Sequence, residues 1–171
     1  DTARHKLFVI FQMTYLGAPM VYYGDEAGMW GANDPCCRKP MVWPDLTYEP
    51  EVVLPDGTAR ETAVPVQFNH DLHNHYRRLI AIRNSSPALQ RGRFTTRLSD
   101  DTRQLFAFER EHEGEQVVVM LNRSSAAQTV TLDSVGNGRW WDVLNEAEVW
   151  VADGRLTTQL PPLWGRLFLR A

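Results

Sequence analysis

The run GAPMVYYGDE at residues 17–26 decides the fold of the first part of this chain. It follows a mostly apolar segment, residues 5–15, whose length and following glycine predict a buried helix. Residues 20–23 are β-prone and apolar on both faces, and they stop at Gly24. This pattern predicts a buried strand of a parallel sheet that is covered by helices. A helix, a tight turn and a buried strand in this order indicate an α/β fold.

A long connection separates this strand from a second helix. Residues 27–66 are rich in Pro, Gly and Asp without a sustained period, and a connection of this length is usually functional. A helix is then predicted from Asp71 to just before Pro87, with Asn69 or Asp71 as its N-cap. The three-and-four spacing that predicts it is set by Leu72, Tyr76, Leu79, Ile80 and Arg83.

The pattern changes after Gly92 to short alternating strands. They are expected near residues 105–108, 117–121, 129–132, 140–144 and 167–169, with turn residues between them. Regular spacing of this kind predicts an antiparallel β-sandwich. The fold class is therefore α/β plus all-β, with residues 1–91 as the α/β part and residues 92–171 as a small sandwich.

The composition is that of a globular protein and excludes several classes of partner. Of the 171 residues 43% are hydrophobic and 23% are charged, and the net charge of −3 gives no reason to expect nucleic acid. No apolar run approaches the roughly 20 residues that cross a membrane. The polar start at Asp1 is not a signal peptide, which leaves a cytoplasmic and a periplasmic or secreted location open. Cys36 and Cys37 are adjacent, which disfavours both a disulfide and a structural zinc site.

Residues 17–43 resemble the α-amylase family of glycoside hydrolases, most closely the branch of cyclomaltodextrinases, neopullulanases and maltogenic amylases. The resemblance is carried by GAP (17–19), YYGDE (22–26), GMWG (28–31), NDP (33–35) and RKPMVW (38–43). It implies that residues 20–23 are the eighth strand of a (β/α)8 barrel. It also implies that RRLIAIR (77–83) with PAL (87–89) belongs to the last barrel helix and that the sandwich is the C-terminal domain. The chain is then a C-terminal fragment of a longer enzyme.

The loop that begins at Glu26 is the expected substrate-binding region, because barrel sites form from loops at the C-terminal ends of strands. Asp34 and Arg38 are four apart and can offer a carboxylate acceptor and a guanidinium donor to neighbouring sugar hydroxyls. The resemblance assigns the equivalent pair to a glucose on the non-reducing side of the cleaved bond. The alternative is a salt bridge that only holds the loop, and the two roles are compatible.

Trp30 and Glu26 are further substrate-binding candidates. Trp30 would offer a ring face to a sugar or, alternatively, pack the loop. Asp25 and Glu26 point to opposite sides of an extended strand, so they cannot flank one bond. Retaining hydrolysis needs carboxyl groups roughly 5–5.5 Å apart across the substrate. One of these acids is expected to support the site, and neither is expected to be the nucleophile.

Three other motifs are interpreted without catalytic roles. NHD at 69–71 spells the tripeptide that ends the family's seventh strand, but here it follows the eighth-strand motif and opens a helix, so it is a helix cap. DTAR at 1–4 is similar to the tail of that motif but lies too near the eighth strand, so Asp1 is expected to cap the first helix. His70, His73 and His75 lack the four-residue spacing of metal ligands on a helix, so no metal and no cofactor are predicted.

The resemblance implies a retaining glycoside hydrolase for α-glucosidic bonds of maltooligosaccharides, cyclodextrins or related α-glucans. Its nucleophile and general acid lie on the family's fourth and fifth strands, so this chain is assigned no catalytic residue and is expected to be inactive alone. The missing part of the barrel and a homodimer of the full-length enzyme are the implied partners. The rival is a non-catalytic carbohydrate-binding or interaction module on the sandwich, with an aromatic platform of Trp140, Trp141, Trp150 and Trp164.

Overall fold

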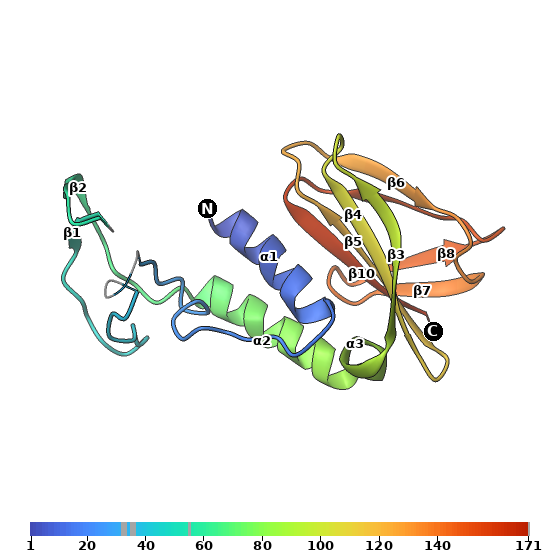
Figure 1. Cartoon of the computed structure of the whole chain (residues 1–171), viewed down its shortest axis with the longest axis horizontal. Helices are drawn as coiled ribbons and strands as arrows, with labels where there is room; N and C mark the ends of the chain where they lie inside the picture. Colours follow the sequence, from blue (N-terminus) through green and yellow to red (C-terminus); the bar gives the residue numbers. More distant parts are fainter. Residues whose placement is uncertain (32–33, 35–36, 55, 171) are drawn as a thin grey trace. The chain divides into compact units, whose positions relative to one another are not determined.

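The chain, seen in a computed structural model that describes residues 1–31, 34, 37–54 and 56–170, divides into two compact units. The first unit consists of Asp1–Pro19 together with Arg78–Ala171, and the second is Met20–Arg77. The first unit holds a β-sandwich with helices, and the second holds the long connection between the two main helices (Figure 1).

The first unit begins with helix α1, Thr2–Thr14. The Asp1 carboxylate accepts hydrogen bonds from the backbone nitrogens of Ala3 (3.1 Å) and Arg4 (3.5 Å), which confirms Asp1 as the helix cap. Helix α2, His70–Ser85, runs from the second unit into the first and ends before Pro87, as the sequence predicted. The short helix α3, Pro87–Arg91, starts at its Ser86 N-cap.

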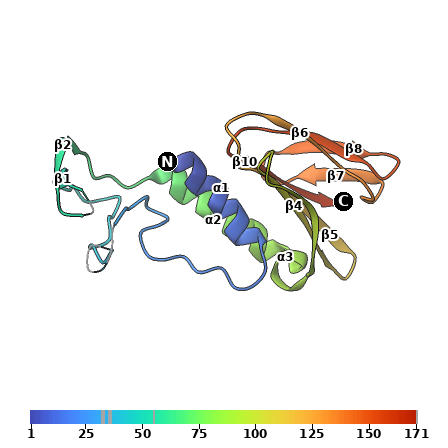
Figure 2. The same ribbon diagram turned by 45° about the horizontal axis from the view of Figure 1, so that its top comes forward.

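An antiparallel sandwich follows, and the predicted change of architecture after Gly92 coincides with the start of its first strand. Within the described residues one sheet has the order β3-β4-β5-β10-β7-β8 and the other pairs β6 with β9. Figures 1 and 2 show the two sheets as stacked layers. The strands are β3 (Arg93–Asp100), β4 (Leu105–His112), β5 (Glu115–Asn122), β6 (Gln128–Leu132), β7 (Gly138–Asp142), β8 (Ala147–Val151), β9 (Leu156–Leu160) and β10 (Trp164–Arg170).

The core of the sandwich lies between these sheets. The large, fully buried side chains Trp140 and Phe168 pack there with aliphatic residues from both sheets, such as Leu156 and Leu160 of β9. Successive side chains of a strand point to opposite faces, so on β7 Trp140 points into the core while its neighbour Trp141 is exposed. The alternating strands that the sequence predicted thus contribute side chains to this core.

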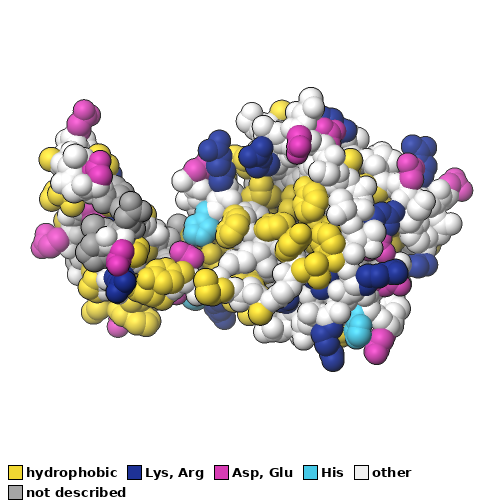
Figure 3. All heavy atoms as spheres, in the orientation of Figure 1, with side chains coloured by type: hydrophobic (Ala, Val, Ile, Leu, Met, Phe, Trp, Pro, Cys, Tyr) yellow, Lys and Arg dark blue, Asp and Glu magenta, His cyan; other side chains and the backbone are white. Residues whose placement is uncertain are grey.

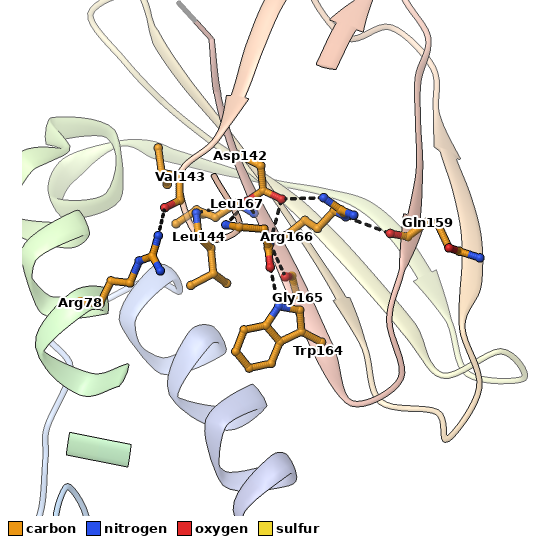
Figure 4. Close-up of polar contacts among 10 residues, drawn as sticks. Arg78, Asp142, Val143, Leu144, Gln159, Trp164, Gly165, Arg166 and Leu167 are labelled. Carbon is orange, nitrogen blue, oxygen red and sulfur yellow. Dashed lines mark hydrogen bonds and ion pairs between the residues drawn. The ribbon is translucent and has the colours of Figure 1, made fainter. Parts of the chain in front are cut away.

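A buried carboxylate joins β7, the turn that follows it and β10. Asp142 is fully buried, and its Oδ1 accepts hydrogen bonds from the backbone nitrogens of Leu144, Asn145 and Leu167, each at 3.2 Å. Its Oδ2 accepts from the Asn145 side chain (2.8 Å) and from Nη1 of Arg166 (3.0 Å). Figure 4 shows how Arg166 reaches from this carboxylate to the backbone of Gln159. One side chain thus connects the end of β7 and the turn after it to β10, which is distant in the sequence.

The second unit contains a hairpin that the sequence analysis missed. Strands β1 (Glu51–Val53) and β2 (Ala59–Val64) pair in antiparallel register. The first residues of α2 also belong to this unit, and Asn69 accepts a hydrogen bond from the backbone nitrogen of Leu72 (3.0 Å). This contact confirms the interpretation of NHD at 69–71 as a helix cap.

The predicted buried strand at residues 20–23 is not a strand in the structure. Met20 is 76% exposed, and Tyr22 and Tyr23 are also exposed. The physical reason is that a parallel strand exists only beside neighbours that satisfy its backbone hydrogen bonds. None of the strands within the described residues pairs with this segment.

Candidate functional site

The loop that carries the family resemblance opens with a series of tight turns. Gly24 and Gly28 both have positive φ, +92° and +75°, which a residue with a Cβ adopts at a cost. The backbone nitrogen of Met29 donates to the carbonyl of Gly24 (2.9 Å), and the Glu26 carboxylate accepts from the nitrogen of Gly24 (2.9 Å). The predicted extended geometry of Asp25 and Glu26 is therefore wrong. The Glu26 side chain folds back onto the turn and binds the backbone of Gly24.

Asp25 and Glu26 also influence the pKa of Tyr76, a residue of α2 in the same unit. Burial and then the negative charges of Asp25 and Glu26 raise the pKa of Tyr76 to about 12. The Tyr76 side chain is therefore neutral at any physiological pH. The hydrogen bond from the nitrogen of Gly24 places Glu26 in the local structure of the turn.

Asp34 and Arg38 are brought together as the sequence predicted. Nη2 of Arg38 lies 2.7 Å from Oδ2 of Asp34, and both side chains are well exposed. An exposed ion pair contributes little to stability, so a ligand can recruit its donors and acceptors at small cost. The pair suits both interpretations, the loop salt bridge and the sugar contact. Their motif neighbours Asn33, Pro35 and Cys36 lie outside the described residues.

Trp30 contacts two cations. The ammonium of Lys39 lies 3.5 Å from the centroid of the Trp30 ring, and the guanidinium carbon of Arg60 lies 4.5 Å from it. Nζ of Lys39 also contacts Oε1 of Glu51 at 2.5 Å, and Nη2 of Arg60 lies 3.9 Å from Oε2 of Glu51. The structure thus shows Trp30 in contact with neighbouring loop and hairpin side chains, and a role of its ring in sugar binding stays a prediction.

Lys39, Glu51 and Arg60 are the residues that sequence reasoning missed at this site. Lys39 belongs to the motif RKPMVW, but the sequence analysis gave it no role. Glu51 and Arg60 were predicted to lie in the long connection, without a strand. Asp56-Gly57 between β-prone residues is a hairpin signal, and it would have placed Glu51 and Arg60 on paired strands.

Two cavities in the second unit adjoin this cluster. One of 180 Å³ is lined by Tyr22, Tyr23, Gly24, Asp25, Met29, Trp30, Gly31, Cys37 and Lys39. The other, of 290 Å³, is lined by Gly28, Met29, Trp30, Lys39, Pro40, Val42, Tyr48, Glu49, Glu51, Pro65, Val66 and Gln67. Both combine apolar or aromatic walls with a few charged and polar groups, which is the usual construction of a small-molecule site.

The described part of the chain shows no grouping of three His, Cys, Asp or Glu side chains that could hold a metal ion. The rings of His70 and His73 instead lie 4.9 and 5.1 Å from the ring of Phe68. None of the helices in the described part of the chain is long and apolar enough to cross a membrane.

The four tryptophans of the rival reading do not form one platform. Trp140 is in the sandwich core, and Nε1 of Trp164 donates to Asn145 (2.7 Å). Trp141 and Trp150 are exposed. Of these four tryptophans, Trp141 and Trp150 are thus the two with large exposed rings.

Comparison with known proteins identifies relatives that are named neopullulanase, cyclomaltodextrinase and maltogenic α-amylase. Residues 94–164 match the family model described as "Maltogenic Amylase, C-terminal domain". The chain is 36% identical over 169 residues to Neopullulanase 2 of Thermoactinomyces vulgaris, which covers 98% of this chain and 26% of the relative. It is 33% identical to a cyclomaltodextrinase of Geobacillus thermopakistaniensis, covering 95% of this chain and 24% of the relative. The chain therefore spans about a quarter of the length of these relatives.

Solved structures show the same fold. An Anoxybacillus α-amylase superimposes with a TM-score of 0.79 at 24% identity, over 98% of this chain and 32% of that one. The α-amylase of Geobacillus thermoleovorans, solved with acarbose, superimposes with a TM-score of 0.77 at 21% identity, over 99% of this chain and 33% of that one.

Proposed function

Since this chain belongs to the α-amylase family of glycoside hydrolases, in the branch of neopullulanases, cyclomaltodextrinases and maltogenic amylases, we propose that it forms the C-terminal part of a retaining enzyme. The proposed substrates are maltooligosaccharides, cyclodextrins or related α-glucans, in keeping with the names of the relatives. The nucleophile and the general acid are proposed to lie in another part of the enzyme, so this chain contributes substrate binding.

Residues 1–91 are proposed to close a (β/α)8 barrel whose other part packs against them. In the second unit, the exposed residues Met20, Tyr22 and Tyr23 support this, since a strand at this position would form only beside neighbouring strands. In the first unit, hydrophobic side chains gather on one face (Figure 3). A groove of 530 Å³ in that unit is lined by Arg4, Leu7, Phe8, Phe11, Gln104, Leu121 and Arg123. Apolar surface of this kind favours contact with further protein.

The exposed Asp34–Arg38 pair is the single observation that carries the binding role. The carboxylate accepts from one sugar hydroxyl while the guanidinium donates to the next, and the pair as a whole is neutral like the sugar. The contact requires no proton transfer. It would hold a glucose unit beside the reacting bond and raise the rate by positioning the substrate.

Asp34→Ala and Arg38→Ala are each expected to lower kcat/KM on maltotriose about 10- to 100-fold, since each removes hydrogen bonds from a charged group to the substrate. The assay uses the complete polypeptide that contains this chain. The midpoint of thermal unfolding should not change, because both side chains are exposed.

Asp133→Ala and Arg155→Ala provide the matched control. These residues form a comparably exposed ion pair at 3.2 Å on the sandwich, so their removal should leave kcat/KM unchanged. A change of less than twofold for both loop variants would refute the binding role. Hydrolysis of maltotriose by the 171-residue chain alone would refute the placement of the catalytic groups outside it.

A further inference from the structure

Two tryptophans share the outer face of strands β7 and β8. Trp141 is 42% exposed and Trp150 is 71% exposed. Trp140, the neighbour of Trp141 on β7, points to the other side of the sheet and into the core. In the ladder Trp141 stands opposite Glu148, and Arg139 stands opposite Trp150. The two indoles are therefore diagonal neighbours on one face, about 7 Å apart, within reach of a single ligand.

This face is held rigidly. Trp140 anchors β7 in the sandwich core, and Asp142 ties the end of β7 to β10 through Leu167 and Arg166 (Figure 4). Helix α1 packs against β5 and β10, and α3 packs against β4 and β5. The indoles of β7 and β8 thus stand on a fixed sheet, and binding to them costs little ordering of the backbone.

The polar groups beside the indoles suit a neutral ligand with many hydroxyls. Arg139 and Glu148 form an exposed ion pair, with Nη1 of Arg139 lying 3.6 Å from Oε2 of Glu148. They offer donors and acceptors next to the two rings, and their charges cancel. An anionic or cationic partner would meet no net charge here.

The size of the face favours a short oligosaccharide over a protein. Two paired strands of five residues cover about 17 Å by about 10 Å, or about 170 Å². A stable protein interface buries about 800 Å² on each partner. Contacts confined to these two strands would therefore be too small for a stable interface with another protein or with a second copy of this chain.

We infer that Trp141 and Trp150 form a surface site for an α-glucan chain, separate in sequence from the loop of Asp34 and Arg38. Two consecutive glucose rings stack with their C–H faces on the two indoles, and Arg139 and Glu148 exchange hydrogen bonds with hydroxyls at the ring edges. The inference rests on the proposed function for the class of sugar. The site would keep a long glucan close to the enzyme between cleavage events.

The test measures maltoheptaose binding to the 171-residue chain by titration calorimetry. The double variant Asp34→Ala/Arg38→Ala removes the loop contact, so the remaining binding reports the surface site. Adding Trp141→Ala and Trp150→Ala should then weaken binding tenfold or more, about the effect of losing two stacked rings. Adding Phe8→Ala instead, which removes an exposed aromatic ring of α1, should leave it unchanged.

The outcomes separate the two proposals. If the variant with both tryptophans replaced binds maltoheptaose within twofold of its parent, the surface site is refuted and the loop proposal is unaffected. If Asp34→Ala/Arg38→Ala binds as the unsubstituted chain does and the tryptophan variants lose binding, the surface site is supported and the loop contact is refuted. Unchanged unfolding midpoints show that the variants are folded.

Discussion

Replacing Asp142 with alanine is expected to lower the free energy of unfolding by about 3–5 kcal/mol, the usual result of removing one partner of a buried ion pair. The carboxylate is fully buried and accepts five hydrogen bonds, one of them from Arg166. Its loss leaves three backbone N–H groups without this acceptor and removes the carboxylate partner of Arg166, whose guanidinium keeps only the carbonyl of Gln159. Urea unfolding of the 171-residue chain measures the change.

Two further variants sharpen this result. Asp133→Ala removes an exposed carboxylate from its 3.2 Å contact with Arg155, so it should cost no more than about 0.5 kcal/mol. Asp142→Asn keeps an acceptor oxygen for the backbone but removes the charge opposite Arg166, so its cost should lie between the two. A loss below about 1 kcal/mol for Asp142→Ala would show that the network is not a principal support of the sandwich.

Arg110→Met is expected to lower the free energy of unfolding by about 3 kcal/mol, because it leaves backbone carbonyls without a donor. Nη1 of Arg110 donates to the carbonyls of Thr14 (3.0 Å) and Tyr15 (3.1 Å), and Nη2 donates to Gly92 (2.9 Å). The first two carbonyls lie at the C-terminal end of α1, where a cation also meets the negative end of the helix dipole.

A neighbouring arginine performs the same task from α2. Arg83 donates to the carbonyls of Met13 (2.8 Å) and Gly17 (2.6 Å), and burial lowers the pKa of both guanidinium groups. Because arginine stays protonated despite such a shift, both side chains remain donors. The end of α1 is therefore held by two buried arginines, which donate hydrogen bonds to backbone carbonyls and not to carboxylates.

The control for Arg110→Met is Arg93→Met, which removes an exposed guanidinium from its 2.6 Å contact with Glu111. It should change the free energy of unfolding by no more than about 0.5 kcal/mol. Arg110→Lys should recover part of the loss, because one ammonium cannot span the carbonyls that the guanidinium reaches. Equal stabilities for Arg110→Met and the unsubstituted chain would refute the role of Arg110 in holding α1 to the sandwich.

The fold of the sandwich could be predicted where burial alternates along a strand. Trp140 and Trp141 illustrate this, since the period of two places one indole in the core and leaves the other exposed. The helix caps Asp1 and Asn69 could also be predicted, because a cap acts on residues that are two or three positions away.

The candidate site was predictable only in part. The spacing of Asp34 and Arg38 brings the two side chains together without help from the rest of the chain. The environment of Trp30 depends on Arg60, and Arg60 reaches the ring only because the hairpin folds. The residues next to Trp30 in the sequence do not indicate that Arg60 contacts its ring.

The sequence by itself determined the family, the two main helices with the caps Asp1 and Asn69, the alternating strands of the sandwich, and the pairing of Asp34 with Arg38. These properties follow from local spacing, which one segment of chain carries within itself. Only the tertiary structure decided that Trp30 contacts Lys39 and Arg60, that Asp142 joins β7 to β10, and that two arginines hold the end of α1. It also decided that residues 20–23 form no strand within the described residues. The physical reason is that hydrogen bonds, ion pairs and ring contacts between residues distant in the sequence form only when folding brings the partners together, and residues 20–23 pair with no strand of the described chain.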